Sequence, residues 1–445
     1  MKHGDNIEPR VRVGVMSANS IVVDLHGEFV NDKGVLYRDT TVTVCAGQQR
    51  AVFLGDDAFD VAVTLTPADE SCYFTLHDVI IGVSFHWKRA ENQSFKGAVE
   101  FMSERDGEVT AINVLSVEDY LLSVISSEMS AHASLELLKA HAVISRSWLL
   151  AQIMPPVNAK HEYIAAADVE GLRWWDHDDH ENFDVCADDH CQRYQGITRA
   201  STPTVAQAIA ATRGEVLVDS EGSLCDARFS KSCGGVMEQF EYCWQPERYD
   251  YLVARADCDR PHEFPDLTRE DEATRWIMSA PEAYCNTHDP AILSQVLNDY
   301  DRETTDFYRW HVTYTARQLT DLLLRRTGDD YGRVRSLEPL ARGTSGRLWQ
   351  LRVVGERLTR VIGKELAIRY ALSESCLYSS AFVVETGEVD ADGYPETFTL
   401  HGAGWGHGVG LCQIGAAVMG ARGIGYRDIL SHYFPGSRLA PDYAK

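Results

Sequence analysis

The amino-acid sequence predicts an α+β protein in which a β-rich core carries a pair of helices and a glycine-rich loop. Three observations lead to this fold class. Residues 8–115 contain short runs of β-branched residues separated by Gly and Asp turn signals. Residues 116–153 have the periodicity of two helices. Strand-like and helix-like segments then alternate to the end of the 445 residues, a length sufficient for two or three domains.

Four units are expected along the chain. Residues 1–110 form an N-terminal β-rich domain, with runs such as RVRVGVM and SIVVDLHG and a hairpin turn at Asp106-Gly107. Residues 111–261 form the first part of a core that contains the helix pair. A helical insertion at 262–335 follows the turn CDRPHEFPD, and residues 336–445 complete the core with the glycine-rich loop.

The composition is that of an ordinary globular protein, with 44% hydrophobic and 24% charged residues. The formal net charge of −24 argues against a nucleic acid as partner, because its phosphates would be repelled. No apolar run approaches the ~20 residues that cross a bilayer, so no membrane span is expected. The N-terminal residues show no apolar signal-peptide segment, which leaves either a cytoplasmic protein or a leader missing from this sequence.

The eleven cysteines are an odd number and too sparse for a disulfide scaffold. Cys225, Cys233, Cys243 and Cys258 lie close enough in sequence for disulfides to be considered. Buried free thiols are the more common outcome in a chain of this size. The spacing leaves both alternatives open.

Residues 116–153 are expected to form two helices joined at 130–133. In the first helix, Leu121, Val124, Ile125 and Glu128 recur at i, i+3, i+4 and i+7, so an apolar stripe ends in a carboxylate. A lone Glu in this position is unusual for a helix that serves only the core. The alternative is a Glu at a fraying helix end.

The second helix is expected to begin after Ser134, which is a suitable N-cap. Lys139 and Arg146 share one face of this helix with Ala142 and Val143. Two cations on the helix that follows the lone Glu form an unusual constellation. The alternative is two solvated cations with no role in a site.

A polar, aromatic-rich stretch at 155–200 contains a candidate metal site. His180, Cys186, His190 and Cys191 offer two thiolates and two imidazoles, which is the ligand set of a closed tetrahedral zinc site. Their spacing is not that of a common zinc finger, and adjacent His190 and Cys191 require a bent loop. The alternative is an acidic surface loop in which His and Cys cluster by chance.

Two further segments are rich in glycine. Gly234-Gly235 follows Ser230 and Ser232 and suggests a tight turn that lets backbone approach a ligand or another strand.

The stretch 401–415, HGAGWGHGVGLCQIG, holds His407, and it holds Gln413 near the expected start of a helix. Such a loop suits the wall of an active-site cleft, and the alternative is a structural turn with a packed His. Neither a P-loop nor a dinucleotide-binding motif is present, so nucleotide chemistry is disfavoured.

The chain resembles the SpoIID/LytB family of peptidoglycan lytic transglycosylases and amidase enhancers. Three blocks carry the resemblance: VEDYLLSVISSEMS…LELLKAHAVISRSWLL, ARFSKSCGGVMEQFEYCW and GWGHGVGLCQIGAAVMGARGIGYRDILSHYFPGS. It implies that Glu128 is the catalytic acid/base and that Lys139 and Arg146 line the cleft with it. Ser230, Ser232, His407 and Gln413 would contact substrate, and DVCADDHCQ looks like the zinc-binding insert of some members. The chain departs from the family pattern at Cys412, where a Ser is expected, at Phe229, and at Cys233 beside the glycines.

The resemblance implies cleavage of the β-1,4 bond between N-acetylmuramic acid and N-acetylglucosamine in glycan strands, with 1,6-anhydro products and an extracytoplasmic location. A single carboxylate suits this reaction, because glycosidases that hydrolyse generally use two. Any zinc would be structural, and no cofactor is required for the chemistry. The alternative function is a non-catalytic glycan-binding amidase enhancer, which would have a cell-wall amidase as partner. A zinc hydrolase is disfavoured, since four protein ligands leave no position for a catalytic water.

Overall fold

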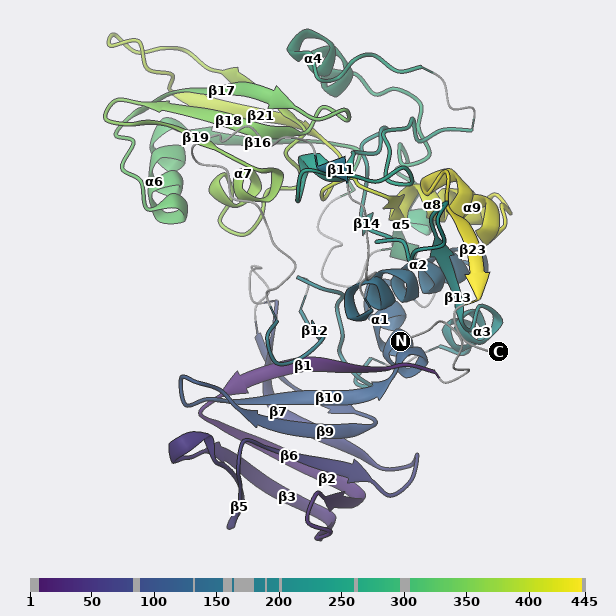
Figure 1. The fold of residues 1–445 in the computed structure, drawn as a ribbon. Helices are drawn as coiled ribbons and strands as arrows, with labels where there is room; N and C mark the ends of the chain where they lie inside the picture. The colour runs from purple at the N-terminus through teal and green to yellow at the C-terminus, as the bar shows by residue number, and fades with distance from the viewer. Residues whose placement is uncertain are drawn as a thin grey trace.

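The structure is a computed structural model that describes residues 8–82, 89–130, 133–154, 162–163, 180–188, 190–199, 202–259, 263–296 and 305–441. It confirms the α+β class. An N-terminal β-sheet, a group of helices and a second β unit follow one another through the molecule (Figure 1). In the described part of the chain, no helix is both long and apolar enough to cross a bilayer.

The N-terminal β unit is an extended, mainly antiparallel sheet in which buried and exposed side chains alternate along the strands. Strand β10 runs antiparallel to β1 and leads directly into helix α1. On its other edge β1 is joined by the short strand β12. The strands are β1 (Arg10–Ala18), β2 (Ser20–Asn31), β3 (Leu36–Ala46), β4 (Val52–Leu54), β5 (Asp57–Phe59), β6 (Ala62–Pro67), β7 (Tyr73–Ile81), β8 (Arg89–Phe95), β9 (Ala98–Ser103), β10 (Val109–Ser116) and β12 (Val185–Cys186).

A helical layer lies beside β1 and β10 and is built around α1 (Val117–Glu128) and α2 (Leu135–Ile153) (Figure 1). One continuous hydrophobic core runs from the N-terminal sheet through this layer. The layer also contains α3 (Pro203–Ala211), α5 (Pro290–Val296), α8 (Gln413–Ala421) and α9 (Tyr426–Tyr433), with the strand pairs β11 (Glu162–Tyr163) and β15 (Glu247–Arg248), β13 (Glu215–Val218) and β23 (Arg438–Pro441), and β14 (Phe229–Ser230) and β22 (Leu411–Cys412).

The second β unit has a hydrophobic core of its own, formed by residues between Trp310 and Leu400. It contains two three-stranded sheets, β16 (Arg309–Thr315), β21 (Thr397–Ala403) and β20 (Phe382–Thr386), and β17 (Val334–Arg342), β18 (Leu348–Gly355) and β19 (Thr359–Ile362). Helices α4 (Glu270–Met278), α6 (Ala316–Thr327) and α7 (Glu365–Ala371) accompany these sheets.

The segment 262–335, expected to be helical, contains α4, α5 and α6 but also strand β16. Strand β16 pairs over its whole length with β21, about ninety residues further along the chain. The pairing therefore depends on a distant partner that local periodicity does not reveal. The four domain boundaries stay predictions.

Candidate functional site

The two central helices begin as their sequence predicts, because each has a serine N-cap. The Ser116 hydroxyl accepts a hydrogen bond from the Asp119 amide at 3.2 Å, and the Ser134 hydroxyl accepts one from the Leu137 amide at 3.3 Å. Glu128 is the last residue of α1. The apolar stripe that precedes it is fully buried, whereas Glu128 itself is half-buried.

Glu128 is held by a segment far away in sequence. Its Oε1 accepts a long hydrogen bond, 3.4 Å, from the backbone amide of Arg193. The turn after Glu128 is fixed by Gln295 of α5, whose backbone carbonyl accepts from the Ser130 amide at 3.0 Å and whose side-chain oxygen accepts from the Ser134 amide at 3.0 Å. These contacts orient the end of α1, and within the described residues no hydrogen bond is made by the second oxygen of the Glu128 carboxylate.

The four predicted metal ligands lie together in the structure. The ligand atoms of His180, Cys186, His190 and Cys191 are all within 4.8 Å of one another. His180 Nε2 is 3.3 Å and His190 Nδ1 is 3.5 Å from the Cys191 sulfur, and His190 Nδ1 is 3.9 Å from the Cys186 sulfur. Tetrahedral zinc with bonds of about 2.3 Å to sulfur and 2.0 Å to nitrogen places such S and N atoms about 3.5 Å apart. The donor set and spacing therefore fit one zinc ion.

The loop that carries these ligands, residues 180–199, is called the metal loop here. It contacts α1 at three points on one helical face: the Tyr120 hydroxyl bonds Gln192, the Gln195 amide bonds the Ser123 hydroxyl, and the Arg193 amide bonds Glu128. These three α1 positions follow the i, i+3, i+8 spacing of one helix face. The metal loop therefore positions the carboxylate of Glu128.

The metal loop is anchored at its other side on the N-terminal sheet. Strand β12 pairs in parallel with β1, with Cys186 opposite Gly14. A Cβ atom at Gly14 would come within 2.5 Å of the Phe183 ring, so the absence of a side chain there lets the loop approach. The loop thus joins the sheet to α1.

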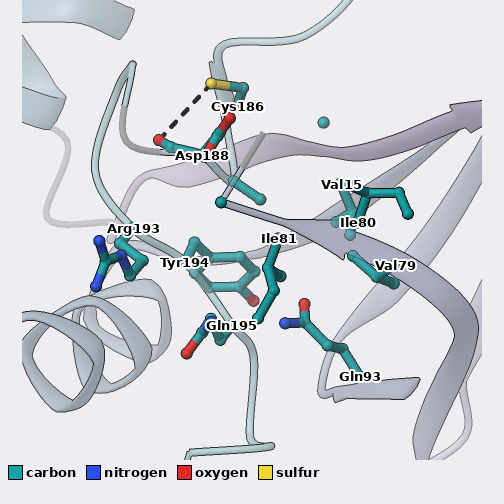
Figure 2. A pocket seen from close by; sticks show the side chains of 13 residues that line it. Val15, Val79, Ile80, Ile81, Gln93, Cys186, Asp188, Arg193, Tyr194 and Gln195 are labelled. Atoms are coloured by element: carbon teal, nitrogen blue, oxygen red, sulfur yellow. Dashed lines mark hydrogen bonds between the residues drawn. The ribbon is translucent and has the colours of Figure 1, made fainter. Parts of the chain in front are cut away.

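A small pocket lies between the metal loop and strands β1 and β7 (Figure 2). Its volume is about 100 Å³, and its lining includes Ile81, Gln93, Cys186, Arg193 and Tyr194. A pocket of this size is too small for a sugar ring with its neighbours, which need several hundred Å³. Neither Glu128 nor His407 lines it. The pocket is a feature of the metal loop's packing and no part of a glycan groove.

Arg146 was expected to line the cleft with Glu128, and the structure places it elsewhere. Its side chain is 0% exposed and makes a two-pronged ion pair with Glu118, at 2.7 and 3.1 Å. Its remaining nitrogen donates to the Glu215 carbonyl at 3.0 Å. All three guanidinium nitrogens therefore bond protein groups, and these bonds link α2 with α1 and β13. The expectation of substrate contact is wrong for this structure.

Lys139 lies two turns before Arg146 on the same helix and is partly accessible, with 19% of its side chain exposed. Its ammonium pairs with Glu136 at 2.7 Å and lies 5.5 Å from the centre of the Tyr426 ring. This pairing holds Lys139 toward α9. Its role in substrate contact stays a prediction.

His407 lies in the glycine loop beside an aromatic and cationic cluster. Its ring makes an edge contact with Trp244 at 4.8 Å, and the Arg228 guanidinium stacks over the same Trp244 at 4.2 Å. His407 Nδ1 accepts the Val409 amide at 3.0 Å, so a proton of the neutral ring belongs on Nε2. Burial lowers the pKa of His407 well below its usual 6.5, and the positive charge of Arg228 acts in the same direction.

Arg228 lies beside the glycine loop and pairs with a neighbouring carboxylate. Its guanidinium makes a two-pronged ion pair with Asp226, at 2.8 and 2.9 Å, and stacks over the Trp244 ring that His407 contacts. Cys191 lies two residues before Arg193, whose amide bonds Glu128. Glu128 and the metal ligands therefore lie together through the metal loop, and His407, Trp244 and Arg228 form a second group at the glycine loop.

Gln413 was expected to face the cleft, but it is only 2% exposed. Its amide nitrogen lies 3.2 Å from Nε2 of His141 on α2, and His141 Nδ1 lies 3.2 Å from the Ser145 hydroxyl. Both hydrogen bonds of the imidazole are formed when neutral His141 donates from Nδ1 to the Ser145 hydroxyl and accepts at Nε2 from the Gln413 amide. Gln413 thus links α8 to α2, and the expectation of substrate contact is corrected.

The neutral state of His141 leads to a prediction about stability. Burial, together with the charge of Lys231, lowers the pKa of His141 from 6.5 to about 3. The unfolded chain therefore binds a proton between these pH values that the folded protein does not bind. Stability should fall as the pH drops through this range, by up to about 1.4 kcal/mol per pH unit for this group. Urea unfolding at pH 7 and pH 5 should show a smaller fall for His141→Gln than for the wild type. Equal falls in the two proteins would contradict the assignment.

Ser230 and Ser232 were also expected to contact substrate, and both side chains are buried. Ser230 lies on β14, which pairs in parallel with β22, and Ser232 exchanges backbone hydrogen bonds with Trp405 at 3.0 and 2.8 Å. In the described part of the chain neither hydroxyl has a hydrogen-bond partner. Backbone groups make the strand pairing, and the side chains of both serines are buried in the core, so the expectation of direct substrate contact is corrected for both.

Three residues of this region were missed by sequence reasoning: Arg193, Gln295 and His141. Arg193 and Gln295 act through backbone groups or a single amide, for which no motif exists. His141 lies on the buried face of α2. The only sequence signal for it is that it stands two residues after Lys139, a predicted site residue.

Comparison with known proteins supports the resemblance. Residues 105–218 match a family model described as Stage II sporulation protein, which covers Glu128 and the metal loop. Residues 238–410 match a model described as a domain of unknown function (DUF8618), which includes His407.

Two curated relatives match most of the chain. The chain is 25% identical to an amidase enhancer of Bacillus subtilis over 333 residues, which are 72% of this chain and 40% of the relative. It is 23% identical to an uncharacterized protein of Brachyspira hyodysenteriae over 342 residues, 77% of this chain and 71% of that protein. The chain therefore spans less than half the length of the amidase enhancer.

Proposed function

Because this chain belongs to the SpoIID/LytB family, we propose that it is a peptidoglycan lytic transglycosylase with Glu128 as its acid/base. The observation that carries the proposal is the setting of Glu128. It is the half-buried end of an otherwise buried helix face, and its single described hydrogen bond comes from a backbone amide at 3.4 Å. An ordinary structural carboxylate of this chain, such as Glu118, is instead fully paired.

The reaction requires one group that first gives and then takes a proton. Protonated Glu128 would donate to the oxygen of the β-1,4 bond between N-acetylmuramic acid and N-acetylglucosamine as the C–O bond breaks. The resulting carboxylate would take the proton of the muramic acid C6 hydroxyl while that oxygen bonds to C1. The products are a 1,6-anhydro end and a free 4-hydroxyl, and Glu128 is protonated again. Substrate of this kind places the protein outside the cytoplasm.

Other residues would serve binding. Lys139 is a candidate for contact with sugar or carbonyl oxygens, since part of its side chain is accessible. His407 would contact a sugar from the glycine loop, with Trp244 beside it. Because the ring is neutral, His407 would take no part in charge stabilisation.

A zinc ion on the metal loop would be structural. His180, Cys186, His190 and Cys191 would hold it, and four protein ligands leave no position for a reacting water. Its role would be to fix the loop whose Arg193 amide bonds Glu128. Any proton transfer would remain with Glu128.

The Cys186→Ser/Cys191→Ser variant tests this role. Metal analysis should show loss of one zinc per chain, because serine does not replace a thiolate toward zinc. Glycan cleavage should fall through misplacement of Glu128, while wild-type cleavage should not depend on zinc added to the assay. Unchanged metal content in the variant would contradict the assignment.

The decisive experiment is digestion of purified, peptide-stripped glycan strands, with products read by mass spectrometry. Products ending in 1,6-anhydro-muramic acid would establish the transglycosylase. Reducing-end products would instead indicate hydrolysis on the same scaffold. Strands that still carry stem peptides, digested in parallel, would show whether the peptides must first be removed.

A second candidate function follows from the similarity to the amidase enhancer. In that role the protein would bind wall glycan or a cell-wall amidase and perform no chemistry. It would raise amidase activity on intact peptidoglycan, and the increase would persist in Glu128→Gln. Absence of any glycan cleavage by the wild type, together with such an increase, would favour this function.

A further inference from the structure

A second cluster of metal-binding side chains lies in the core of the helical layer. The ligand atoms of Cys233, Asp257, Cys285 and Cys412 are all within 4.8 Å of one another, and all four residues are buried. They come from four separate segments. Cys233 follows β14, Asp257 follows the bridge of Val236 with Ala256, Cys285 lies between α4 and α5, and Cys412 ends β22.

The distances in the cluster match a single tetrahedral ion. The sulfur atoms of Cys233 and Cys285 are 3.6 Å apart, and the Cys233 sulfur is 3.4 Å from Oδ2 of Asp257. Tetrahedral zinc with bonds of about 2.3 Å to sulfur and 2.0 Å to oxygen separates two sulfurs by about 3.8 Å and sulfur from oxygen by about 3.5 Å. A disulfide requires about 2.05 Å between sulfurs, so Cys233 and Cys285 are separate thiols, as are the other cysteines.

Surrounding groups support the negative charge that such ligands would carry. The Cys412 sulfur accepts from the amides of Cys233 at 3.3 Å and Gly415 at 3.5 Å, and it is the N-cap of α8, where the helix dipole favours an anion. Oδ1 of Asp257 accepts from the Tyr433 hydroxyl at 2.8 Å. Hydrogen bonds of this kind orient the ligands of metal sites.

Asp257 is a fully buried carboxylate, 0% exposed, and within the described residues no lysine or arginine pairs with it. Its Oδ2 accepts from the Cys285 amide at 3.2 Å, and His432 Nε2 lies 3.5 Å from Oδ1, where it forms an ion pair only when the ring is protonated. A buried carboxylate beside three thiols is costly unless a cation completes it.

We propose that Cys233, Asp257, Cys285 and Cys412 bind a second, structural zinc ion, separate from the ion of the metal loop. Three thiolates favour zinc over magnesium or calcium, and four protein ligands close the coordination sphere. The ion would tie the segment between α4 and α5 to strand β22 and so to the start of α8, where Gln413 bonds His141. The site is independent of glycan chemistry.

Metal content of the purified full-length chain tests the proposal. The wild type should hold two zinc ions, and Cys285→Ser should hold one. Cys186→Ser/Cys191→Ser should also hold one, and that remaining ion should disappear when Cys285→Ser is added. The matched control is Cys225→Ser, because Cys225 is equally buried but belongs to neither cluster. It should keep both ions.

A spectroscopic measurement distinguishes loss of zinc through removal of a ligand from loss of zinc through misfolding of the variant. Cobalt(II) added to metal-free Cys186→Ser/Cys191→Ser should give thiolate-to-cobalt charge-transfer bands and the strong visible bands of a tetrahedral ion. Thermal unfolding of that variant should occur at lower temperature after chelation. Absence of the cobalt bands would overturn the proposal. An unchanged zinc content in Cys285→Ser would also overturn it. So would a Cys233–Cys285 disulfide found by non-reducing mass spectrometry in freshly purified protein.

Discussion

The Glu128→Gln variant is expected to cleave peptide-stripped glycan strands about 10²- to 10⁴-fold more slowly than the wild type, because general acid–base catalysis contributes a factor of this size. Glutamine has the same shape as the glutamate but neither gives nor takes the proton in the two steps. Its side-chain oxygen can still accept the Arg193 amide, so the end of α1 should stay in place. The rate is measured from 1,6-anhydro ends formed per unit time.

A charge-matched control comes from the same helix. Asp119 is exposed near the start of α1, and Asp119→Asn removes one carboxylate charge without touching the candidate site. Its cleavage rate should equal that of the wild type. Retained cleavage by Glu128→Gln, with unchanged thermal unfolding, would remove Glu128 from the mechanism and leave the reaction without its proposed acid/base.

Replacement of Arg146 by alanine should have the largest effect on stability, with a loss of about 3–5 kcal/mol in the free energy of unfolding. The reason is that the buried Glu118 carboxylate would lose its two hydrogen bonds with the Arg146 guanidinium. The Glu215 carbonyl would also lose a donor. Urea unfolding followed by circular dichroism measures the change.

Two companion variants separate this structural role from substrate binding. The double replacement Arg146→Met/Glu118→Leu removes both charges and should recover most of the stability, since a buried ion pair is often exchangeable for apolar side chains. Lys139→Ala on the same helix removes a partly exposed pair and should cost no more than about 1 kcal/mol. If Arg146→Ala unfolds like the wild type but loses glycan binding, the residue contacts substrate after all.

Local features of the sequence predicted the central elements well. The helix pair follows from apolar periodicity and from Ser134 as N-cap, which depend on neighbours within one or two turns. The proximity of the four predicted metal ligands was also predictable, because His180 to Cys191 span a single loop that needs only to bend, and the metal itself stays a prediction. Proximity in sequence gave proximity in space in both cases.

The roles of single polar side chains were harder to predict, because a distant partner decides whether such a group is buried. The family resemblance implies that Arg146 lies in a cleft, whereas Glu118 and the Glu215 carbonyl bind its guanidinium in the core. Gln413 meets His141, 272 residues away. In the sequence Cys233 lies among Cys225, Cys243 and Cys258, whereas its neighbours in the structure are Cys285 and Cys412.

The pairing of β12 with β1 has a consequence for solubility. Strand β12 has only two residues and pairs with β1 at Val13 and Gly14, where it occupies backbone groups that would otherwise offer a template for strands of other molecules. The cover is held by the bent loop of His180 to Cys191 and by little regular structure of its own. We therefore expect a variant in which this loop detaches from β1 to self-associate through the exposed edge of the N-terminal sheet. The loop that bonds Glu128 would then also limit self-association.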